Sequence, residues 1–512
     1  MRFFEYAQNQ AWLFPPSLKE LIKEDDFCRI INDVIERVGV REIENKYVEE
    51  GHPAYHPKMM TKIYLYAYAV GIRSSRKIAR ELEGNVKFWY LSGRQTPDFR
   101  TISDFRKNHM EEIKILFKKV VQLCCELGMV NLGLVAIDGT RIKANASERE
   151  TKTEEGLRKE LEGIGGDISR FLKEAEETDN EEDRKYGYDK RGDEVPKQIA
   201  KSKDRKKKIE EALKKLKEKE LNKINVTDND AKIMRQKKGD FGPAYNCQTA
   251  VDGKREIIIA AETFSAGVDT NLLEEVTEAA EGTVGGTPEK VISDCGYHSA
   301  KNIEYLGKKG IDGYIPDLSI KAIKKEKSGE TKANPFGKEA FYYDPDQDCY
   351  ICPEKKKLIR TKSSRGRYRN NDGGIYRLAA KECRMCKHFG VCVKSNNGRM
   401  IDRDGGEALR KKMAEKVRSP EGMAIYGKRM HIAEMPFANI KQNLGFREFL
   451  LRGLKKVDGE FKIICIVHNM KMIYRHIYSK GKDAGPPGVQ GLNGLDCRKN
   501  KNRYRILDKP PA

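Results

Sequence analysis

Apolar positions recur at helical spacing along the first quarter of the chain and at strand-like spacing after it. The segments HPKMMTKIYLYAYAVGI, SSRKIARELEGN and FRTISDFRKNHMEEIKILFKKVVQLCCELGM have apolar residues three and four positions apart, which predicts a helical domain over residues 1–130. From Gly133 the pattern changes, and LGLVAIDG, AYNCQTAVDG and REIIIAAETFS predict three strands, the last two forming a hairpin. The helices TNLLEEVTEAAEG and SAKNIEYLGKKG then alternate with the strands KVISDCG and DGYIPDL. This order predicts an α/β fold in which a mixed sheet is flanked by helices.

Two insertions interrupt the order of the core. The core sheet is assigned to residues 131–147 and 226–319, and residues 406–479 return to helical periodicity as a further part of the same domain. Between them, residues 148–225 are dense in Lys, Glu, Arg and Asp and predict a charged helical insertion, with disorder as the alternative. Residues 320–405 form the second insertion. Residues 480–512 are Gly/Pro-rich and then basic, which predicts a disordered tail that attracts phosphate.

Paired cysteines mark the second insertion. Cys349-x-x-Cys352 and Cys383-x-x-Cys386 are two knuckles about thirty residues apart, a pattern typical of a zinc ribbon. His388 and Cys392 are alternatives for one of the four ligands. Because a site made of four thiolates has no open coordination position, the predicted Zn²⁺ is structural.

The charge balance points to a polyanion as partner. The formal net charge is +21 over 512 residues, which favours nucleic acid bound largely through counterion release. No apolar stretch approaches eighteen residues and no basic amphipathic helix has a clean apolar face, so a membrane partner is not expected. The N-terminus lacks the features of a signal peptide, and single cysteines in apolar runs resemble reduced core thiols, which predicts a cytoplasmic protein.

Basic residues gather in the N-terminal helical segments. They are Arg73, Arg76, Lys77, Arg80, Arg100 and Arg106. Short helices with this charge suit a DNA-binding module, and the alternative is an ordinary helical bundle with solvated arginines.

Three acidic residues carry the candidate chemistry. Asp138 and Asp294 each end an apolar, strand-like run, and Glu434 lies in the C-terminal helical region. A carboxylate at the end of a buried strand is costly unless a cation, a hydrogen bond or water compensates it. On a basic chain, three such residues favour two Mg²⁺ (or Mn²⁺) ions held against a phosphodiester, where paired ions stabilise the attacking and leaving oxygens. Taken alone, Asp138 followed by Gly139 is more often a simple turn.

Basic and polar residues accompany these carboxylates. Lys441 lies seven positions after Glu434, about two helical turns, and therefore on nearly the same face. The candidates for DNA or phosphate contacts are Lys441, Tyr426, Arg429 and Arg141. The alternative for the segment of Glu434 and Lys441 is an amphipathic helix with a solvated face, and the alternative for Arg141 is a cation of a loop.

A further polar pair lies on the second predicted strand. Asn246 and Gln248 alternate along it, which predicts that both project from one face beside Asp138.

Four sequence blocks in this order resemble the DDE transposases of bacterial insertion sequences, in the branch with a Tyr-Arg-Glu-Lys signature. The blocks are DGTRIKANAS, YNCQTAVD, VISDCGYHS and YGKRMHIAEMPFANIKQNLGFREFLLRGL with VHNM after it, joined by HPKMM and PDFRTISDF near the N-terminus. The resemblance covers most of residues 50–478. It implies an RNase H-like catalytic core with Asp138, Asp294 and Glu434 as the metal-binding triad.

The resemblance also implies a reaction and its partners. The expected activity is metal-dependent cleavage of double-stranded DNA at the terminal inverted repeats of an element, followed by transfer of the 3′-hydroxyl into target DNA. A homodimer or larger assembly on DNA is expected, associated with the nucleoid when bound. The alternatives are a metal-dependent nuclease that cuts without joining, and a domesticated DNA-binding protein without catalysis.

One departure from the signature concerns the arginine. The usual form has three residues between Arg and Glu, whereas four residues separate Arg429 from Glu434. Lys428 and His431 are therefore alternatives for the role of Arg429.

Overall fold

A computed structural model gives the fold of most of the chain. It describes residues 17–47, 53–186, 197–236, 239–318, 320, 335–361, 373–403 and 405–479. The predicted basic tail, residues 480–512, lies outside the described residues. The architecture is mixed α/β, as the hydrophobic pattern predicts, and no helix in the described ranges is long and apolar enough to cross a membrane.

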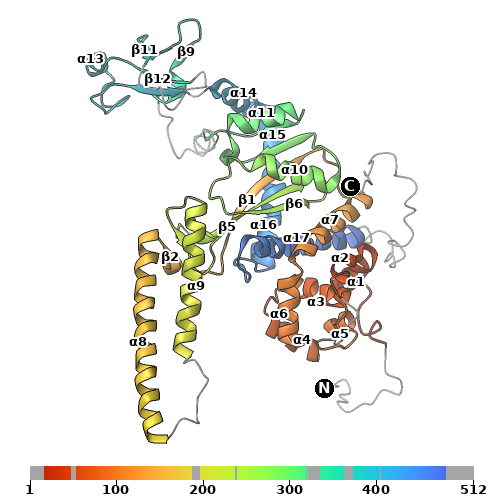
Figure 1. Ribbon diagram of the computed structural model, residues 1–512. Helices are drawn as coiled ribbons and strands as arrows, with labels where there is room; N and C mark the ends of the chain where they lie inside the picture. The colour runs from red at the N-terminus through yellow and green to blue at the C-terminus, as the bar shows by residue number, and fades with distance from the viewer. Residues whose placement is uncertain are drawn as a thin grey trace, which may run out of the picture.

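A mixed sheet lies at the centre of the molecule (Figure 1). Strand β5 (Phe241–Asp252) is antiparallel to both β1 (Val135–Lys143) and β6 (Ile257–Phe264), and β5 and β6 form the predicted hairpin. On the other side of β1, β7 (Lys290–Ser293) and β8 (Asp312–Tyr314) are parallel to it and to each other. The short strand β4 (Lys232–Arg235) pairs with the outer part of β5. The spatial order is thus β6-β5-β1-β7-β8, with β1 in the middle.

Helices cover the sheet and link it to the N-terminal region. Helix α10 (Leu273–Val284) packs on β6 and β5, and α11 (Ala300–Lys308) packs beside β8. The long helix α17 (Leu454–Ser479) is buried on nearly all sides from residue 457 to 470, because its apolar residues are not confined to one face. It packs against β6 and also against the N-terminal helices α7 and α3, so a single hydrophobic core runs through both regions.

Polar side chains of α17 fix its position on β6. The side-chain amide of Asn469 accepts a hydrogen bond from the backbone N–H of Ile258 at 2.9 Å and donates one to its carbonyl at 2.9 Å. His468 contacts the carbonyl of Glu256 at 3.0 Å, and burial lowers its pKa to about 4. These contacts satisfy strand groups beside the β-bulge near Ile259, where the register with β5 shifts.

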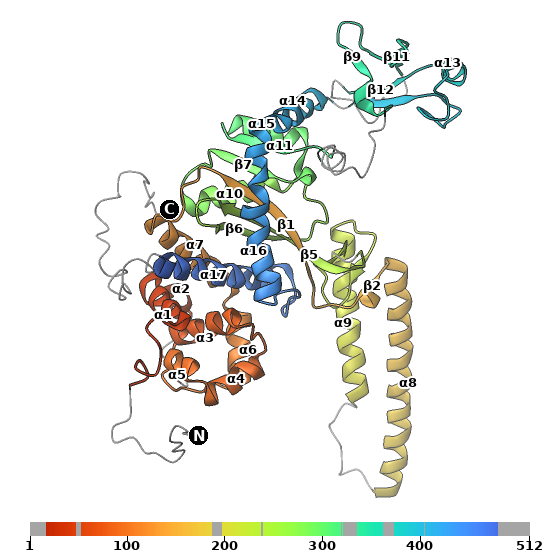
Figure 2. The same ribbon diagram turned by 180° about the vertical axis from the view of Figure 1, so that it is seen from behind.

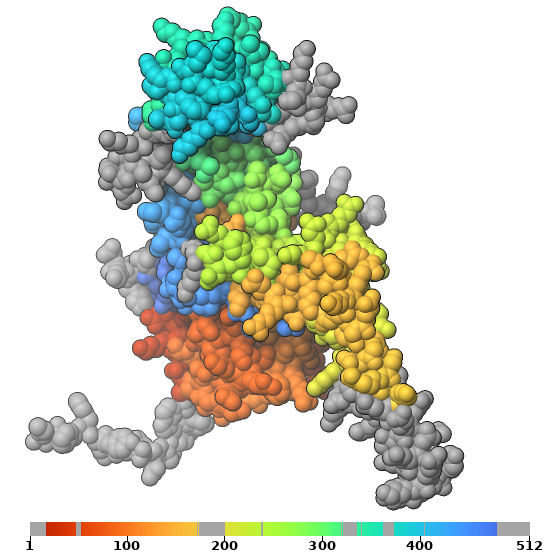
Figure 3. Space-filling view, turned by 90° about the vertical axis from the view of Figure 1, so that its left-hand side faces the viewer, coloured from red at the N-terminus to blue at the C-terminus, as the bar shows by residue number. Residues whose placement is uncertain are grey.

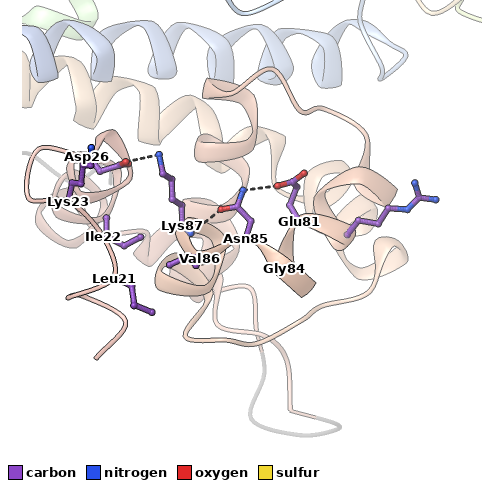
Figure 4. A pocket seen from close by; sticks show the side chains of 10 residues that line it. Leu21, Ile22, Lys23, Asp26, Glu81, Gly84, Asn85, Val86 and Lys87 are labelled. Carbon is purple, nitrogen blue, oxygen red and sulfur yellow. Dashed lines mark hydrogen bonds and ion pairs between the residues drawn. The ribbon is translucent and has the colours of Figure 1, made fainter. Parts of the chain in front are cut away.

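Seven helices form the described N-terminal region. They are α1 (Phe27–Val38), α2 (Arg41–Glu44), α3 (Pro57–Ala69), α4 (Ser75–Gly84), α5 (Val86–Ser92), α6 (Phe99–Asn108) and α7 (Met110–Glu126). An open cavity of about 740 Å³ lies between the segment before α1 and the helices α4 and α5, far in sequence from Asp138, Asp294 and Glu434 (Figure 4). Two interactions join residues that line this cavity. Lys87 forms an ion pair with Asp26 at 2.6 Å, and Asn85 donates a hydrogen bond to Glu81 at 2.7 Å.

The basic residues of these helices divide into two groups. Arg106 is buried and donates to the carbonyl of Arg73, and Arg73 donates to the carbonyl of Glu448, so both arginines hold the helical region together and to the C-terminal part. The other four are exposed to solvent: Arg76, Lys77, Arg80 and Arg100. Of the two interpretations of this region, the bundle fits the first group and a nucleic-acid surface fits the second.

The charged insertion is a helical hairpin. Helices α8 (Glu154–Tyr186) and α9 (Lys197–Glu218) lie side by side and project from the sheet domain (Figures 1 and 2). At their base, β2 (Thr151–Lys152) pairs with β3 (Ile224–Asn225), and a small apolar cluster that includes Leu157 and Ile209 is buried there. Arg205 bridges Glu150 and Glu160 across the base.

The second insertion is a separate lobe at one end of the molecule (Figure 3), and it contains its own antiparallel sheet. Its strands, in chain and spatial order, are β9 (Tyr342–Asp344), β10 (Cys349–Ile351), β11 (Lys357–Arg360), β12 (Gly374–Arg377) and β13 (Met400–Arg403), with the short helix α13 (Ala380–Arg384) before β13. Among the described residues, its own core is small and contains seven buried residues: Phe341, Tyr350, Leu358, Tyr376, Leu378, Cys383 and Ile401.

Candidate active site

Asp138 and Asp294 are neighbours across the parallel pair β1–β7. The pairing of these strands ends at Ile137 and Ser293, and the two aspartates are the next residues of each chain segment. Asp138 lies within β1 and not at its end as predicted, because β1 continues to Lys143 against β5. Asp294 begins a 3₁₀ turn and accepts a hydrogen bond at 2.7 Å from the N–H of Gly296.

The C-terminal helices bring Glu434 to the neighbourhood of Asp138. Helix α14 (Glu407–Arg418) is followed by α15 (Pro420–Gly427), a π-helical turn (Met430–Glu434), α16 (Met435–Ala438) and a second π-helical turn (Asn439–Asn443). The segment crosses the sheet at β1 (Figure 2), and the first π-turn packs on β1 and β5.

Arg429 joins two of the three acidic residues. Its guanidinium is 2.9 Å from Oδ2 of Asp138 and 3.3 Å from Oε1 of Glu434. A π-turn holds one residue more than an α-turn, so the extra residue between Arg429 and Glu434 is accommodated where it occurs. The alternative His431 instead lies 3.1 Å from Glu256 and is largely exposed. The other alternative, Lys428, is exposed at the end of α15. Arg429 is a basic residue that the structure brings to the acidic group.

Burial makes the ionised form of Asp138 costly. The pKa of Asp138 is raised to about 6, chiefly by desolvation, and the neighbouring Asp294 adds to the rise while Arg429 opposes it. Both Asp138 and Arg429 are nearly enclosed, with side chains 12% and 14% exposed. Glu434 is more open, at 55%. The result is a cluster of carboxylates that requires a cation, and the guanidinium of Arg429 supplies one.

The other predicted contact residues lie close by, with different partners. Lys441 donates to the hydroxyl of Thr140 and, at 3.0 Å, to the carbonyl of Arg141, so its ammonium lies along β1 just past Asp138. Tyr426 is on α15, and burial raises the pKa of its hydroxyl. Arg141 donates to the carbonyl of Gly267 at 2.8 Å, so the structure places it against the loop after β6 and not toward the acidic cluster.

Asn246 and Gln248 share one face of β5, as predicted, but it is not the face of Asp138. Asp138 is paired with Thr249, whereas Gln248 is paired with Gly139, and directly opposed residues project to the same side of a sheet. The two amides therefore lie behind the sheet, opposite Arg429. The expectation that they lie beside Asp138 is corrected by this register.

A fourth carboxylate, Asp269, was not found from the sequence. It lies in the loop between β6 and α10, where its Oδ1 accepts hydrogen bonds from Asn246 at 2.6 Å and Gln248 at 2.8 Å. Asp269 follows the apolar strand β6 as Asp294 follows β7, but four residues separate Asp269 from Phe264, the last residue of β6.

The cysteines of the second insertion do not group as the spacing predicts. A cavity of about 30 Å³ is lined by Cys352, Cys383, Cys386 and Cys392 together with His388. Cys349 is absent from it, because it lies in β10 and alternation puts it on the opposite face from Tyr350 and the following Cys352. Within the described ranges, no three His, Cys, Asp or Glu side chains are grouped as a preformed metal site.

Two protein-family models match the chain, one over the N-terminal helices and the other over the C-terminal part. Residues 16–108 match the family model described as "Transposase domain (DUF772)", and residues 351–474 match "Transposase DDE domain". The second match contains Glu434, whereas Asp138 and Asp294 lie before it. No curated protein and no solved structure matches the chain. The two family matches support a DDE transposase of an insertion sequence.

Proposed function

We propose that this transposase cleaves DNA at the ends of its element and transfers the freed 3′-hydroxyl into target DNA, with Asp138, Asp294 and Glu434 as the acidic triad. The observation that carries the proposal is the meeting of residues from three distant segments. Asp138 and Asp294 follow the last pair of β1 and β7, and Arg429 connects Asp138 to Glu434. Such convergence has no role in packing, since burying charges costs free energy unless each is compensated.

The residues present fit divalent metal ions. Carboxylate oxygens are the ligands that Mg²⁺ and Mn²⁺ prefer. The negative charge of Asp294 contributes to the raised pKa of Asp138. A cation between the two carboxylates would reverse this rise in pKa. Asp138, Asp294 and Glu434 would hold two such ions, which when bound polarise the phosphate and the attacking and leaving oxygens. Arg429 occupies part of this place in the structure, and on metal binding it would be free to contact a DNA phosphate.

The sheet order supports an RNase H-like core. Numbered along the chain without the short β4, the strands lie in the spatial order 3-2-1-4-5, with the first three antiparallel and the last two parallel to the first. The predicted triad lies on and beside the central strand β1. In this proposal Lys441, next to Thr140, and Tyr426 contact the DNA backbone near the scissile phosphate.

We assign the binding of the element ends to the N-terminal helices. The chain would act in an assembly of at least two copies. The exposed residues Arg76 and Arg100 flank the ring of Phe99, with their guanidinium carbons 5.0 Å and 5.7 Å from its centroid. Together with Lys77 and Arg80 they would contact the terminal inverted repeats. Pairing two element ends calls for a homodimer or larger assembly on DNA.

The test is a reaction with DNA of known sequence. The purified full chain is incubated with duplex oligonucleotides carrying the ends of its element and with a supercoiled target plasmid, in Mg²⁺ or in EDTA. We expect nicking at the element end and joined products with Mg²⁺ alone. Nicking without joining would favour the metal-dependent nuclease, and the absence of both would favour a DNA-binding protein without catalysis.

We also propose that the second insertion binds one structural Zn²⁺, through Cys352, Cys383, Cys386 and Cys392. Backbone N–H groups of Lys356 and Arg399 donate to the sulfurs of Cys352 at 3.3 Å and Cys383 at 3.2 Å, as thiolate ligands require. Cys392 takes the place predicted for Cys349, since it lines the cavity. His388 is not needed, because it faces Glu354 at 3.1 Å. A lobe with so small a core needs such a cross-link.

A further inference from the structure

We propose that Asp269 is a positioning residue of the catalytic centre, which holds the turn that carries Asp294 in register with β1. The inference rests on the proposed function, because it assigns Asp294 a role at the reacting phosphate. Asp269 acts through two buried amides, Asn246 and Gln248, which project from the face of β5 opposite that of Asp138.

The buried amides connect Asp269 to the turn of Asp294. Gln248 is 0% exposed, and its Nε2 donates both to Oδ1 of Asp269 at 2.8 Å and to Oδ1 of Asn246 at 2.9 Å. The other end of the same amide accepts a hydrogen bond from the hydroxyl of Tyr297, three residues after Asp294. Because the Nε2 donors face Asp269 and the Oε1 acceptor faces Tyr297, the orientation of this amide is fixed.

A second set of bonds joins the loop of Asp269 to the same turn. Thr270, the next residue, donates through its hydroxyl to the carbonyl of Gly296 at 3.2 Å. Asn302, 1% exposed, donates to the carbonyls of both Thr270 at 2.7 Å and Tyr297 at 2.8 Å. The loop and the turn are thus held together at several points, and Asp269 is the only carboxylate in these contacts within the described residues.

Close packing leaves this network little freedom to rearrange. A Cβ atom on Gly139, beside Asp138, would lie 2.1 Å from Nε2 of Gln248, so the amide rests directly on the backbone of β1. A Cβ atom on Gly296 would lie 2.9 Å from Oδ1 of Asp294 and 3.6 Å from Oδ2 of Asp269, so both carboxylates closely flank the same peptide. A shift of Asp269 or Gln248 therefore moves the Asp294 turn relative to Asp138, and a displacement of about 1 Å can cost roughly a hundredfold in rate.

The test compares substitutions that remove this network with one that keeps its acceptor. In Asp269→Ala and Gln248→Met the single-turnover nicking rate should fall roughly ten- to a hundredfold, and more Mg²⁺ should be needed for half-maximal rate. The affinity for the DNA end, measured by gel shift, should not change. Asp269→Asn keeps an oxygen acceptor for the two amides and should recover most of the rate. The double variant should be no slower than the slower single variant, because both changes break one network.

The controls separate this proposal from folding defects and from the proposed function itself. Asp167→Ala removes an exposed carboxylate on α8 and should leave rate and Mg²⁺ dependence unchanged. Wild-type nicking with equal rates in Asp269→Ala would overturn the positioning role alone. A wild-type chain that shows no Mg²⁺-dependent nicking would instead contradict the proposed function. A fall in rate with an unchanged Mg²⁺ requirement and no recovery in Asp269→Asn would indicate a structural defect and would also overturn the proposal.

Discussion

Replacing Asp138 by Asn should reduce the rate of DNA nicking by about three orders of magnitude, and Asp294→Asn should have a similar effect. Stabilisation of transition-state charge by metal ions contributes several kcal/mol, and each 1.4 kcal/mol corresponds to about a tenfold change in rate. Asn preserves the shape of the side chain but removes the charge that holds the ion. The measurement is single-turnover nicking of a labelled element end in Mg²⁺.

The sheet provides a matched control for these substitutions. Asp312 is also a carboxylate on a core strand, but it is paired with Lys290 at the opposite end of β7 and forms an ion pair with Lys416 on α14. Asp312→Asn should keep the nicking rate of the wild type. An equal loss in Asp312→Asn would mean that the effect comes from the sheet as a whole, and full activity in Asp138→Asn would remove Asp138 from the centre.

The second large effect concerns zinc in the second insertion. The full chain should contain about one zinc ion, and Cys392→Ser should lose it, whereas Cys349→Ser should keep it. The pair is well matched, because each change removes one thiol from the same lobe and only Cys392 lines the cavity. Structural zinc contributes on the order of 10 kcal/mol in small domains, which exceeds what a seven-residue core can replace.

Metal content and the state of the thiols are both to be measured. Plasma mass spectrometry of the purified chain gives the zinc stoichiometry, and limited proteolysis should show that residues 335–403 become sensitive in Cys392→Ser. Retention of zinc in Cys392→Ser with loss in Cys349→Ser would restore the ligand set that the CxxC spacing predicts. A zinc-free wild type with a disulfide among these cysteines would contradict a metal site altogether.

Hydrophobic patterning is sufficient to predict five strands of the central sheet, β1, β5, β6, β7 and β8, but not the short β4. The apolar runs around Asp138 and Asp294 are long enough to identify strands. The alternation from Asn246 to Ala250 likewise gives the shared face of the two amides. It cannot say which face of β5 meets Asp138, because that depends on the register with β1, which is set by contacts distant in sequence.

The remaining differences have the same origin in tertiary structure. The end of β1 extends past Asp138 because β5 offers a partner for its next five residues. The π-turn that brings Arg429 to Asp138 is not encoded in a local motif, and helical spacing assumes regular α-turns. Cys349 fits a zinc knuckle by spacing, yet pairing on both sides of β10 turns its side chain away from Cys352. Spacing identifies the residue types of a site, whereas register decides which of them meet.

The most direct test of the acidic triad is the binding of Mn²⁺, followed by electron paramagnetic resonance on the full chain with and without an element end. We expect saturable binding that is lost in Asp138→Asn and Asp294→Asn and kept in Asp312→Asn. Binding should become tighter in Arg429→Gln, because the guanidinium competes with the ions for Asp138 and Glu434. Equal Mn²⁺ binding by the wild type and by the Asp138→Asn and Asp294→Asn variants would contradict the central claim.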